Sequence, residues 1–256
     1  MHFTFLFFSI ILVQTSVWCW AQETKSDSSS SVPSSVKKDV SDSKSALRRM
    51  HNHLIAAKDL EFTTKFSIVD KAMGRNQSGT VHYVLRKPNL LRVTATLGNK
   101  KLVLVSDGGT LIIHEANKGK YRRVPAADTI VGNLYLASGL LSIPVRMVDF
   151  FWSVDYLNIL GSVDDLADVS GVAKLTKLPA QTVGTKTCDG FNIQYSDDNW
   201  SVWLERSKIR LPCRLVSKRK DGSALTTQTN SFAWKANPTI KADAFLFVAP
   251  KGHTMR

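Results

Sequence analysis

Apolar and polar residues alternate along two long parts of the chain. In the first part, Leu60–Val124, the side chains of Phe62, Thr64 and Phe66 fall on one face of a strand and the residues between them fall on the other. Turn signals such as Asp107-Gly108-Gly109 divide this part into six runs, of which Leu102–Val105 is apolar on both faces. We therefore expect six consecutive strands in an antiparallel meander.

The second alternating part begins near Val172 and extends almost to the end of the chain. Phe191, Ile193 and Tyr195 share one face of a run there, and Asp221-Gly222 turns between two other runs. The strands expected in this part cover residues 172–175, 181–183, 188–195, 200–205, 213–220, 225–232 and 245–248.

Two further segments have the character of helices. Residues 45–58 place Leu47, Met50 and Leu54 in one apolar stripe, with Ser45 as the N-cap. Apolar residues crowd between 126 and 160 without alternation, which predicts short helices that cover an apolar sheet face and gives an α+β fold. Two alternatives stay open: these helices fill the core, or they line or plug a cavity and move to admit a ligand.

The first 45 residues lack the pattern of a folded domain. Residues 1–21 form an apolar run ending in Cys19-Trp20-Ala21, which predicts a signal peptide cleaved after Ala21 and export of the chain. Trp18 stands where a lipobox has a small residue, so we expect no lipid anchor on Cys19. Residues 22–45 are rich in Ser, Lys and Asp and predict a flexible linker. A single domain is then expected over residues 46–256.

The chain is basic. It has 34 Lys and Arg against 21 Asp and Glu in 256 residues, a formal net charge of +13. This charge suits an anionic partner such as a lipid head group or an envelope polymer, although scattered charges are also typical of a solvated surface. Export and the lack of a basic-aromatic motif argue against nucleic acid as a partner.

Two cysteines remain after the leader, Cys188 and Cys213, and an exported protein can join them. If they begin the first and third strands of one meander, two strand spacings of about 4.8 Å each separate them. That separation exceeds the limit of about 7 Å for Cα atoms joined by a disulfide. A twisted or frayed strand end would bring the cysteines closer, so both alternatives stay open for this pair.

Catalytic and metal-binding motifs are missing from the sequence. It has no nucleophile elbow, P-loop, C-x-x-C or H-E-x-x-H motif. Asp164, Asp165 and Asp168 do not have the spacing of an EF-hand, and His51 and His53 point to different sides of a helix. We therefore predict a protein without enzymatic activity, metal ion or cofactor.

Six short motifs remain, and none of them is catalytic. They are Lys87-Pro88-Asn89-Leu90-Leu91-Arg92-Val93, Ser106-Asp107-Gly108-Gly109-Thr110-Leu111, Glu115-Ala116-Asn117 with Tyr121, Trp200-Ser201-Val202-Trp203-Leu204-Glu205, Leu211-Pro212-Cys213-Arg214-Leu215 and Phe245-Leu246-Phe247-Val248-Ala249-Pro250. The first three resemble the outer-membrane lipoprotein carriers and their relatives. With the last three motifs and the expected opening helix, the chain is more similar still to an uncharacterised family of predicted periplasmic proteins thought to share the carrier fold, over roughly Ala46–Gly252.

This resemblance implies a periplasmic protein with a strongly curved antiparallel sheet, a half-open barrel, and helices covering its concave face. In the carriers that interior takes acyl chains. The resemblance thus implies an apolar, acyl-bearing ligand, a lipid or lipoprotein, in a protein that is at most peripheral to the membrane. The candidate cavity-lining residues are Phe66, Tyr83, Leu134, Leu141, Trp152, Phe191 and Trp200. Arg86, Arg92, Arg122 and Arg123 are candidates for a basic rim that meets an anionic head group.

A second hypothesis assigns the same chain to a different class of protein. It is an envelope protein-interaction module, with a fully packed core and no small-molecule ligand, that binds a partner protein through its basic exterior. The two hypotheses differ in what lies between the sheet and the helices.

Overall fold

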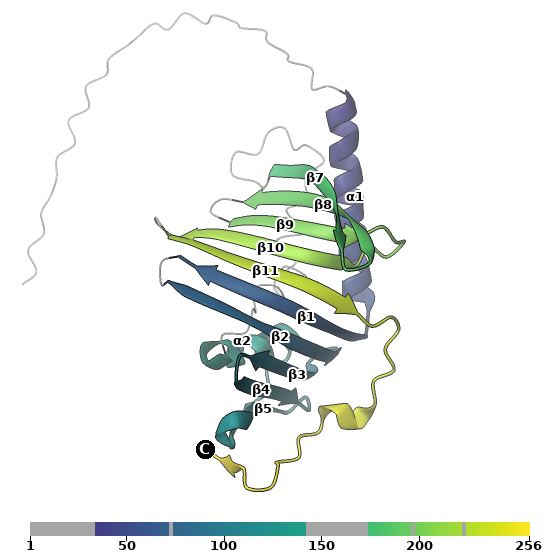
Figure 1. Ribbon diagram of the computed structural model, residues 1–256. Helices are drawn as coiled ribbons and strands as arrows, with labels where there is room; N and C mark the ends of the chain where they lie inside the picture. Colours follow the sequence, from purple (N-terminus) through teal and green to yellow (C-terminus); the bar gives the residue numbers. More distant parts are fainter. Residues whose placement is uncertain (1–33, 72–73, 142–173, 196–197, 222–223) are drawn as a thin grey trace, which may run out of the picture. The chain divides into compact units, whose positions relative to one another are not determined.

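The alternating segments form a single sheet of twelve strands (Figure 1). The computed structural model describes residues 34–71, 74–141, 174–195, 198–221 and 224–256. The described elements are α1 (Ser34–Ala56), β1 (Asp59–Asp70), β2 (Arg75–Arg86), β3 (Leu90–Leu97), β4 (Lys100–Ser106), β5 (Thr110–Glu115), the 3₁₀ turn η1 (Ala116–Lys118), β6 (Lys120–Pro125), α2 (Ile130–Leu141), β7 (Lys174–Val183), β8 (Lys186–Tyr195), β9 (Asp198–Glu205), β10 (Pro212–Asp221), β11 (Ala224–Trp234), the 3₁₀ turn η2 (Ala242–Phe245) and β12 (Thr254–Met255).

Two antiparallel meanders make up most of the sheet. Strands β1 to β6 form the first and β7 to β11 form the second, in the order β12-β6-β5-β4-β3-β2-β1-β11-β10-β9-β8-β7. The meanders join where β1 pairs with β11, from Phe62 opposite Trp234 to Asp70 opposite Thr226. The predicted six-strand meander is thus confirmed, and the second alternating part extends the same sheet.

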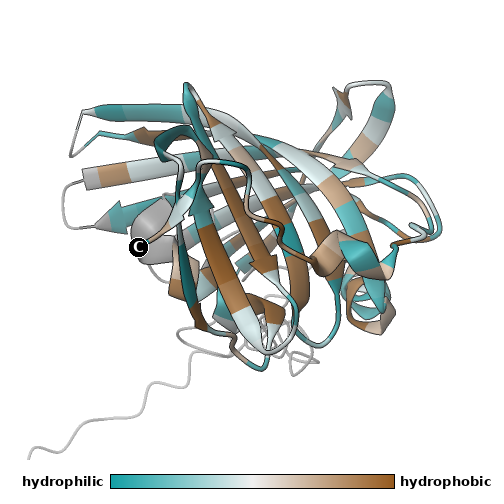
Figure 2. Cartoon of the chain, turned by 90° about the horizontal axis from the view of Figure 1, so that it is seen from below, coloured by the Kyte–Doolittle hydropathy of each residue, from teal (hydrophilic) through white to brown (hydrophobic). Residues whose placement is uncertain are grey.

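The sheet is curved and not closed, and one of its faces packs against both helices (Figure 2). We call this side the helix-covered face and the other side the outer face. Leu47, Met50 and Leu54 of α1 are fully buried, and Ile130 and Leu134 of α2 belong to the same apolar cluster as the strand residues. Burying each such side chain contributes about 1.5–3 kcal/mol. The predicted α+β class, with helices covering a curved antiparallel sheet, is therefore confirmed.

Helix α1 begins earlier than the sequence pattern predicts. It starts at Ser34 rather than Ser45, so residues 34–45 are helical and do not belong to a flexible linker. Ser43 and Ala46 are already buried against the sheet. Tertiary packing of this kind stabilises a helical turn whose own composition is unfavourable. The rest of the predicted linker and the predicted signal peptide lie outside the described residues.

Two strand predictions in the second part are also corrected. The described residues of the run 172–175 and the whole of the run 181–183 belong to one strand, β7, which has an irregular register between Leu178 and Gln181. The run 245–248 is not a strand: η2 ends there, and the chain then crosses the outer face before β12 pairs in parallel with β6. We call residues 240–253 the C-terminal strap. The predicted helices after α2 lie outside the described residues.

The C-terminal strap is held by arginines instead of by a neighbouring strand. Arg92 donates from Nε to the Ala244 carbonyl at 2.5 Å and from Nη2 to the Leu246 carbonyl at 2.6 Å. Arg86 donates to the Ile240 carbonyl at 2.8 Å and pairs with Asp59 at 2.7 Å. These side chains satisfy backbone carbonyls of the strap that a partner strand would otherwise bind.

Candidate functional site

The predicted lining residues that the structure describes all lie in one apolar cluster on the helix-covered face. Phe66, Tyr83, Leu134, Phe191 and Trp200 are each at most 4% exposed and come from β1, β2, α2, β8 and β9. The side chain of Leu141 and the whole of Trp152 lie outside the described residues. The structure therefore brings residues of both meanders and of α2 into one interior, and their role as the lining of a cavity stays a prediction.

Polar side chains cross this interior in a diagonal line over four adjacent strands. Directly opposite residues on paired strands share a face, so the strand registers show that these polar side chains follow one another across the helix-covered face. Ser217 lies opposite Gln228, Asn230 follows on the same strand, and Thr64 and Tyr83 each lie one diagonal step further. All five are at most 6% exposed. We call these five residues the polar stripe.

Several atoms of the polar stripe have no hydrogen-bond partner among the described residues. They are the Tyr83 hydroxyl, Nε2 of Gln228, and both Nδ2 and Oδ1 of Asn230. The Thr64 hydroxyl has only a 3.5 Å contact with the adjacent Lys65 carbonyl, at the limit of hydrogen bonding. A buried polar group left unpaired costs about 1–3 kcal/mol. A sheet interior designed only for packing would avoid such a line of groups.

Tyr83 is fixed as a neutral hydrogen-bonding group. Its ring stacks on Phe62 with centroids 4.7 Å apart, and the Trp234 ring lies 4.4 Å from that of Phe62 on the strand beyond. Complete burial raises the pKa of the Tyr83 hydroxyl far above its ordinary value. The hydroxyl therefore keeps its proton at any physiological pH and can donate as well as accept.

The stripe is rich in donors and carries no charge. Tyr83, Gln228 and Asn230 offer N–H and O–H groups, and the five members include neither a cation nor a carboxylate. Such groups match carbonyl oxygens of a neutral ligand. A buried charged group would require a counter-ion, because transfer of an ion out of water is very costly.

A second candidate site lies on the outer face, beneath the C-terminal strap. It is a pocket of about 380 Å³ that contains two cations and two histidines. Its lining consists of Arg92, Lys101, Val103, His114, Ala116, Leu246, Phe247, Val248, Pro250 and His253. Arg92 donates its hydrogen bonds to carbonyls of the strap, so it is a structural part of the pocket wall.

A histidine pair closes one side of the outer pocket. Nε2 of His114 and Nδ1 of His253 are 2.8 Å apart, and the Phe247 ring packs edge-on against His114 at 5.3 Å. Burial lowers the pKa of His114, and the neighbouring His253 and Lys101 lower it further. The hydrogen bond between the two rings joins the strap to β5.

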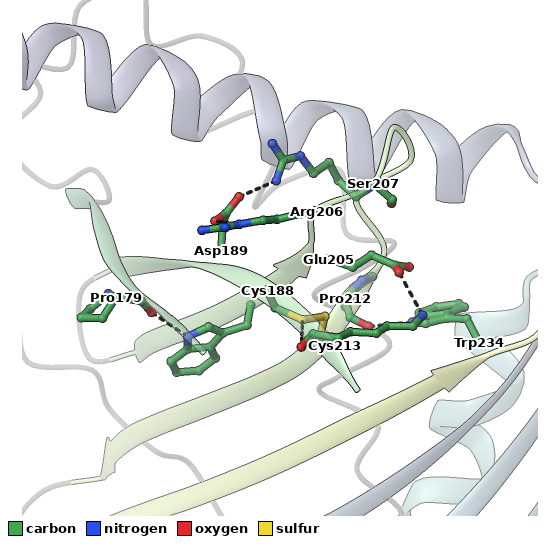
Figure 3. Close-up of a disulfide and its surroundings, with 12 residues drawn as sticks. Pro179, Cys188, Asp189, Glu205, Arg206, Ser207, Pro212, Cys213 and Trp234 are labelled. Atoms are coloured by element: carbon green, nitrogen blue, oxygen red, sulfur yellow. Dashed lines mark hydrogen bonds and ion pairs between the residues drawn. A yellow bond between two sulfur atoms is a disulfide. The ribbon is translucent and has the colours of Figure 1, made fainter. Parts of the chain in front are cut away.

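The cysteines form a disulfide on the outer face of the second meander (Figure 3). The Cα atoms of Cys188 and Cys213 are 6.6 Å apart although β9 lies between their strands. Cys188 is opposite Glu205, the last residue of β9, and the β10 register shifts between Pro212 and Arg214. The intervening strand therefore ends at the bridge, and the bulge moves Cys213 toward Cys188.

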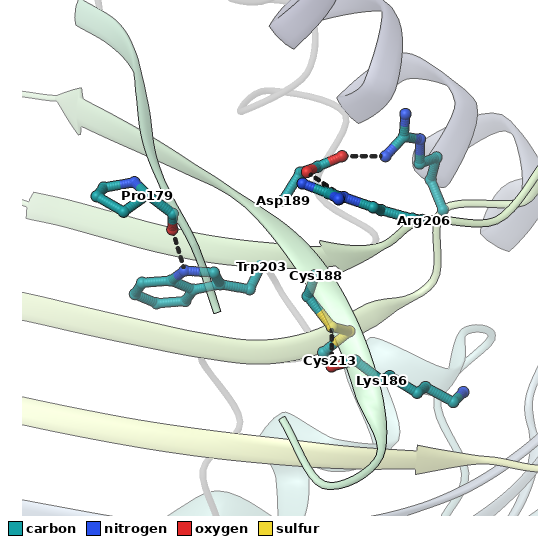
Figure 4. A network of polar contacts seen from close by, with 8 residues as sticks. Pro179, Lys186, Cys188, Asp189, Trp203, Arg206 and Cys213 are labelled. Atoms are coloured by element: carbon teal, nitrogen blue, oxygen red, sulfur yellow. Dashed lines mark hydrogen bonds and ion pairs between the residues drawn. A yellow bond between two sulfur atoms is a disulfide. The ribbon is translucent and has the colours of Figure 1, made fainter. Parts of the chain in front are cut away.

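Several polar side chains near this disulfide have hydrogen-bond or ion-pair partners (Figure 4). Asp189 binds Arg206 at 2.8 Å and Arg210 at 2.6 Å. Burial raises the pKa of Asp189, but the hydrogen bonds from the two arginines outweigh it and hold the pKa below its ordinary value. The indole N–H of Trp203 donates to the Pro179 carbonyl at 3.3 Å.

Gly190 is required where β7 and β9 approach each other here. A Cβ at this position would lie 2.7 Å from Nε1 of Trp203 and 2.8 Å from Cβ of Leu178. The close approach lets the end of β7 cover the disulfide and Trp203, which form a small apolar cluster with Leu178, Val183 and Val216. This corner of the molecule is a structural brace.

Sequence reasoning placed Thr64 on the buried face but missed Gln228, Asn230 and Ser217. The run Thr226–Phe232 has polar residues at successive positions, so its sequence does not reveal which face is buried. A signal did exist: Phe232 and Trp234 set a period of two that includes residues 230 and 228. Extending that period backward would have identified both amides.

Neither a metal centre nor a membrane helix appears in the described part of the chain. There, no three His, Cys, Asp or Glu side chains gather closely enough to hold an ion. Likewise, no helix among the described residues has the length and apolar character needed to cross a membrane.

Comparison with models of known protein families gives a match over most of the chain. The model of a family described as "Predicted periplasmic protein (DUF2092)" matches residues 43–255. No curated protein matches the chain.

Solved structures give distant matches. One is the Pseudomonas aeruginosa MucA/MucB complex, with 13% identity, a TM-score of 0.40, and coverage of 77% of this chain but only 59% of the matched one. Another is the Mycobacterium tuberculosis lipoprotein LppX, with 10% identity, a TM-score of 0.44, and coverage of 78% and 99%. A LolA superfamily protein from Nitrosomonas europaea has 8% identity, a TM-score of 0.36, and coverage of 80% and 97%. Identities this low carry no functional inference.

Proposed function

We propose that this chain, which belongs to the DUF2092 family of predicted periplasmic proteins, is an exported carrier of an apolar, acyl-bearing ligand. The ligand lies between the helix-covered face of the sheet and the helices, and the protein binds it without catalysis. The predicted signal peptide, cleaved after Ala21, delivers the chain to the periplasm.

One observation carries the proposal. The helix-covered face is apolar from one meander to the other, yet polar atoms at its centre have no partner among the described residues. The apolar surface suits hydrocarbon chains, whose transfer from water contributes about 25 cal/mol per Å² buried. The unpaired donors suit the polar linkage that an acyl chain carries at one end. A bound acyl compound would satisfy both kinds of surface together.

The predicted basic rim is revised. Arg86 and Arg92 hold the C-terminal strap through its carbonyls on the outer face, so they are not available for a head group of an interior ligand. Arg122 lies on β6 opposite Ile113 of β5 and is half-buried on the helix-covered side, whereas Arg123 is exposed. Arg122 is therefore the rim cation that we assign to the ligand.

The interaction-module hypothesis has one observation in its favour. Leu246 and Val248 of the C-terminal strap are 58% and 85% exposed beside the outer pocket. Exposed apolar residues next to a groove are typical of a protein-binding surface. This surface would bind an envelope partner whether or not the interior holds a ligand.

Native mass spectrometry tests the proposed function. The full chain is exported in a bacterial host, extracted from the periplasm without detergent, and compared with the same protein after delipidation. We expect a bound mass that disappears on delipidation and returns when an acyl ester is added, on a polypeptide that starts at Gln22. An unliganded mass in every sample, with no uptake of the ester, would contradict the proposal.

A further inference from the structure

We infer that the polar stripe is a binding subsite for the ester or amide carbonyl of the acyl ligand. This inference rests on the proposed function and assigns the chemical group that the interior recognises. The inference rests on Tyr83, Gln228 and Asn230, three nearly or completely buried side chains with atoms unpaired among the described residues.

The location of the stripe supports a binding role. It crosses β10, β11, β1 and β2, where the two meanders join, and so it lies in the middle of the described sheet. Two predicted lining residues flank it, since Phe66 is opposite Asn230 and Trp200 is opposite Ser217, and a third, Tyr83, is a member of the stripe. A linkage bound at the stripe would place its hydrocarbon chain against these aromatic neighbours.

The donor and acceptor pattern selects the group. An ester carbonyl accepts hydrogen bonds, and the stripe offers donors from two amides and a phenol. Both amide atoms of Asn230 are unpaired, so either orientation of its side chain presents one donor and one acceptor. An amide-linked acyl chain, which has a carbonyl and an N–H, would engage both.

Because the stripe carries no charge, it favours a neutral ligand group over an anionic one. A free carboxylate or a phosphate would lie beside Thr, Ser, Asn, Gln and Tyr with no cation among the stripe residues. Burying such an anion without a cation is costly. A plain hydrocarbon would leave the donors unpaired, which is also unfavourable. The neutral acyl ester or amide avoids both penalties.

Three probes of equal chain length separate these cases: monoolein as neutral ester, oleate as free acid, and 1-octadecene as hydrocarbon. Binding is measured by native mass spectrometry and by displacement of a fluorescent acyl ester from the delipidated chain. We expect the wild-type protein to bind monoolein about tenfold more tightly than either other probe, the effect of one good buried hydrogen bond.

Tyr83→Phe and Asn230→Leu test the residues. Each variant should lose about five- to tenfold in affinity for monoolein and nothing for 1-octadecene. Thr229→Val is the matched control, because Thr229 is next to Asn230 on the same strand but faces the outer side. The control should bind all three probes like the wild type. The melting temperature of each ligand-free variant should be equal to or higher than that of wild type, which excludes misfolding as the cause.

The outcomes distinguish failure of the proposed carrier function from failure of the proposed subsite. A wild-type protein that binds none of the probes contradicts the proposed function. A wild-type protein that binds all three equally, or variants that keep the preference for monoolein, would overturn the subsite while leaving the carrier function in place.

Discussion

Two sets of polar groups in the sheet differ in how they are partnered. Asp189, near the start of β8, binds two arginines, and Arg92, on the outer face, binds carbonyls of the C-terminal strap. On the helix-covered face, Tyr83, Gln228 and Asn230 keep atoms unpaired among the described residues. Paired groups hold a fold together, whereas unpaired groups lower stability and persist where a ligand needs them. We therefore expect that removing a paired, structural group lowers the free energy of unfolding, whereas removing an unpaired, ligand-binding group raises it.

The largest expected effect is on the outer face. Replacing both cysteines, Cys188→Ser with Cys213→Ser, removes a bridge across 25 residues and should lower the free energy of unfolding by about 3 kcal/mol. The midpoint of urea unfolding measures the change, and wild-type protein under reducing conditions is the control. An unchanged midpoint would mean that the bulge and the end of β9 hold this corner without the bridge.

A change of opposite sign is expected on the helix-covered face. Asn230→Leu removes unpaired amide atoms and adds apolar surface, so it should raise the free energy of unfolding of the ligand-free protein by about 1 kcal/mol. Thermal unfolding of the delipidated chain measures it, beside Thr229→Val. A loss of 2 kcal/mol or more, roughly that of breaking a satisfied buried bond, would contradict the assignment.

A smaller effect comes from the ion pairs of Asp189. Because the folded state lowers its pKa, the unfolded chain binds more protons as pH falls below about 3.8, so this contribution is present above that pH and lost below it. Asp189→Asn should therefore flatten the acid side of the stability profile, by about 1 kcal/mol at most. Urea midpoints at pH 7 and pH 3 measure this, and equal acid sensitivity in wild type and variant would refute it.

The smallest effect concerns attachment of the C-terminal strap. The pKa of His114 is lowered by burial and by His253 and Lys101, so the unfolded chain binds the proton first as pH falls below about 6.5. The strap should therefore be most stable above that pH and loosen in mild acid.

Amide hydrogen exchange reads this loosening at Thr254, whose N–H donates to the Gly119 carbonyl at 2.9 Å. His114→Gln should remove the dependence between pH 7 and 5, whereas His82→Gln, at a half-exposed histidine paired with Glu61, should leave it in place. Protection at Thr254 that does not change with pH in the wild type would rule out the histidine pair as the cause.

Periodicity predicted the sheet well because burial of one face imposes it. The strands of the first meander, the pairing of helices with one face, and the buried positions of Phe66, Tyr83, Phe191 and Trp200 all follow from that constraint. The predicted strand at 245–248 failed because arginine side chains mimic a partner strand, which no local pattern records.

Features that depend on exact strand geometry were not predictable from the sequence. The bridge between Cys188 and Cys213 depends on where β9 ends and on the bulge in β10. The polar stripe depends on the registers of β1, β10 and β11, and the pairing of β1 with β11 joins residues more than a hundred positions apart. Local composition around Gln228 and Asn230 contains neither kind of information.

The most direct test of the central claim is the ¹³C NMR signal of an acyl ester, labelled at its carbonyl carbon and bound to the delipidated chain. If the stripe donates hydrogen bonds to that carbonyl, the signal should move downfield on binding to the wild type and return toward its position in hydrocarbon solvent with Tyr83→Phe and Asn230→Leu. A bound signal at the hydrocarbon position in all three proteins would contradict the account.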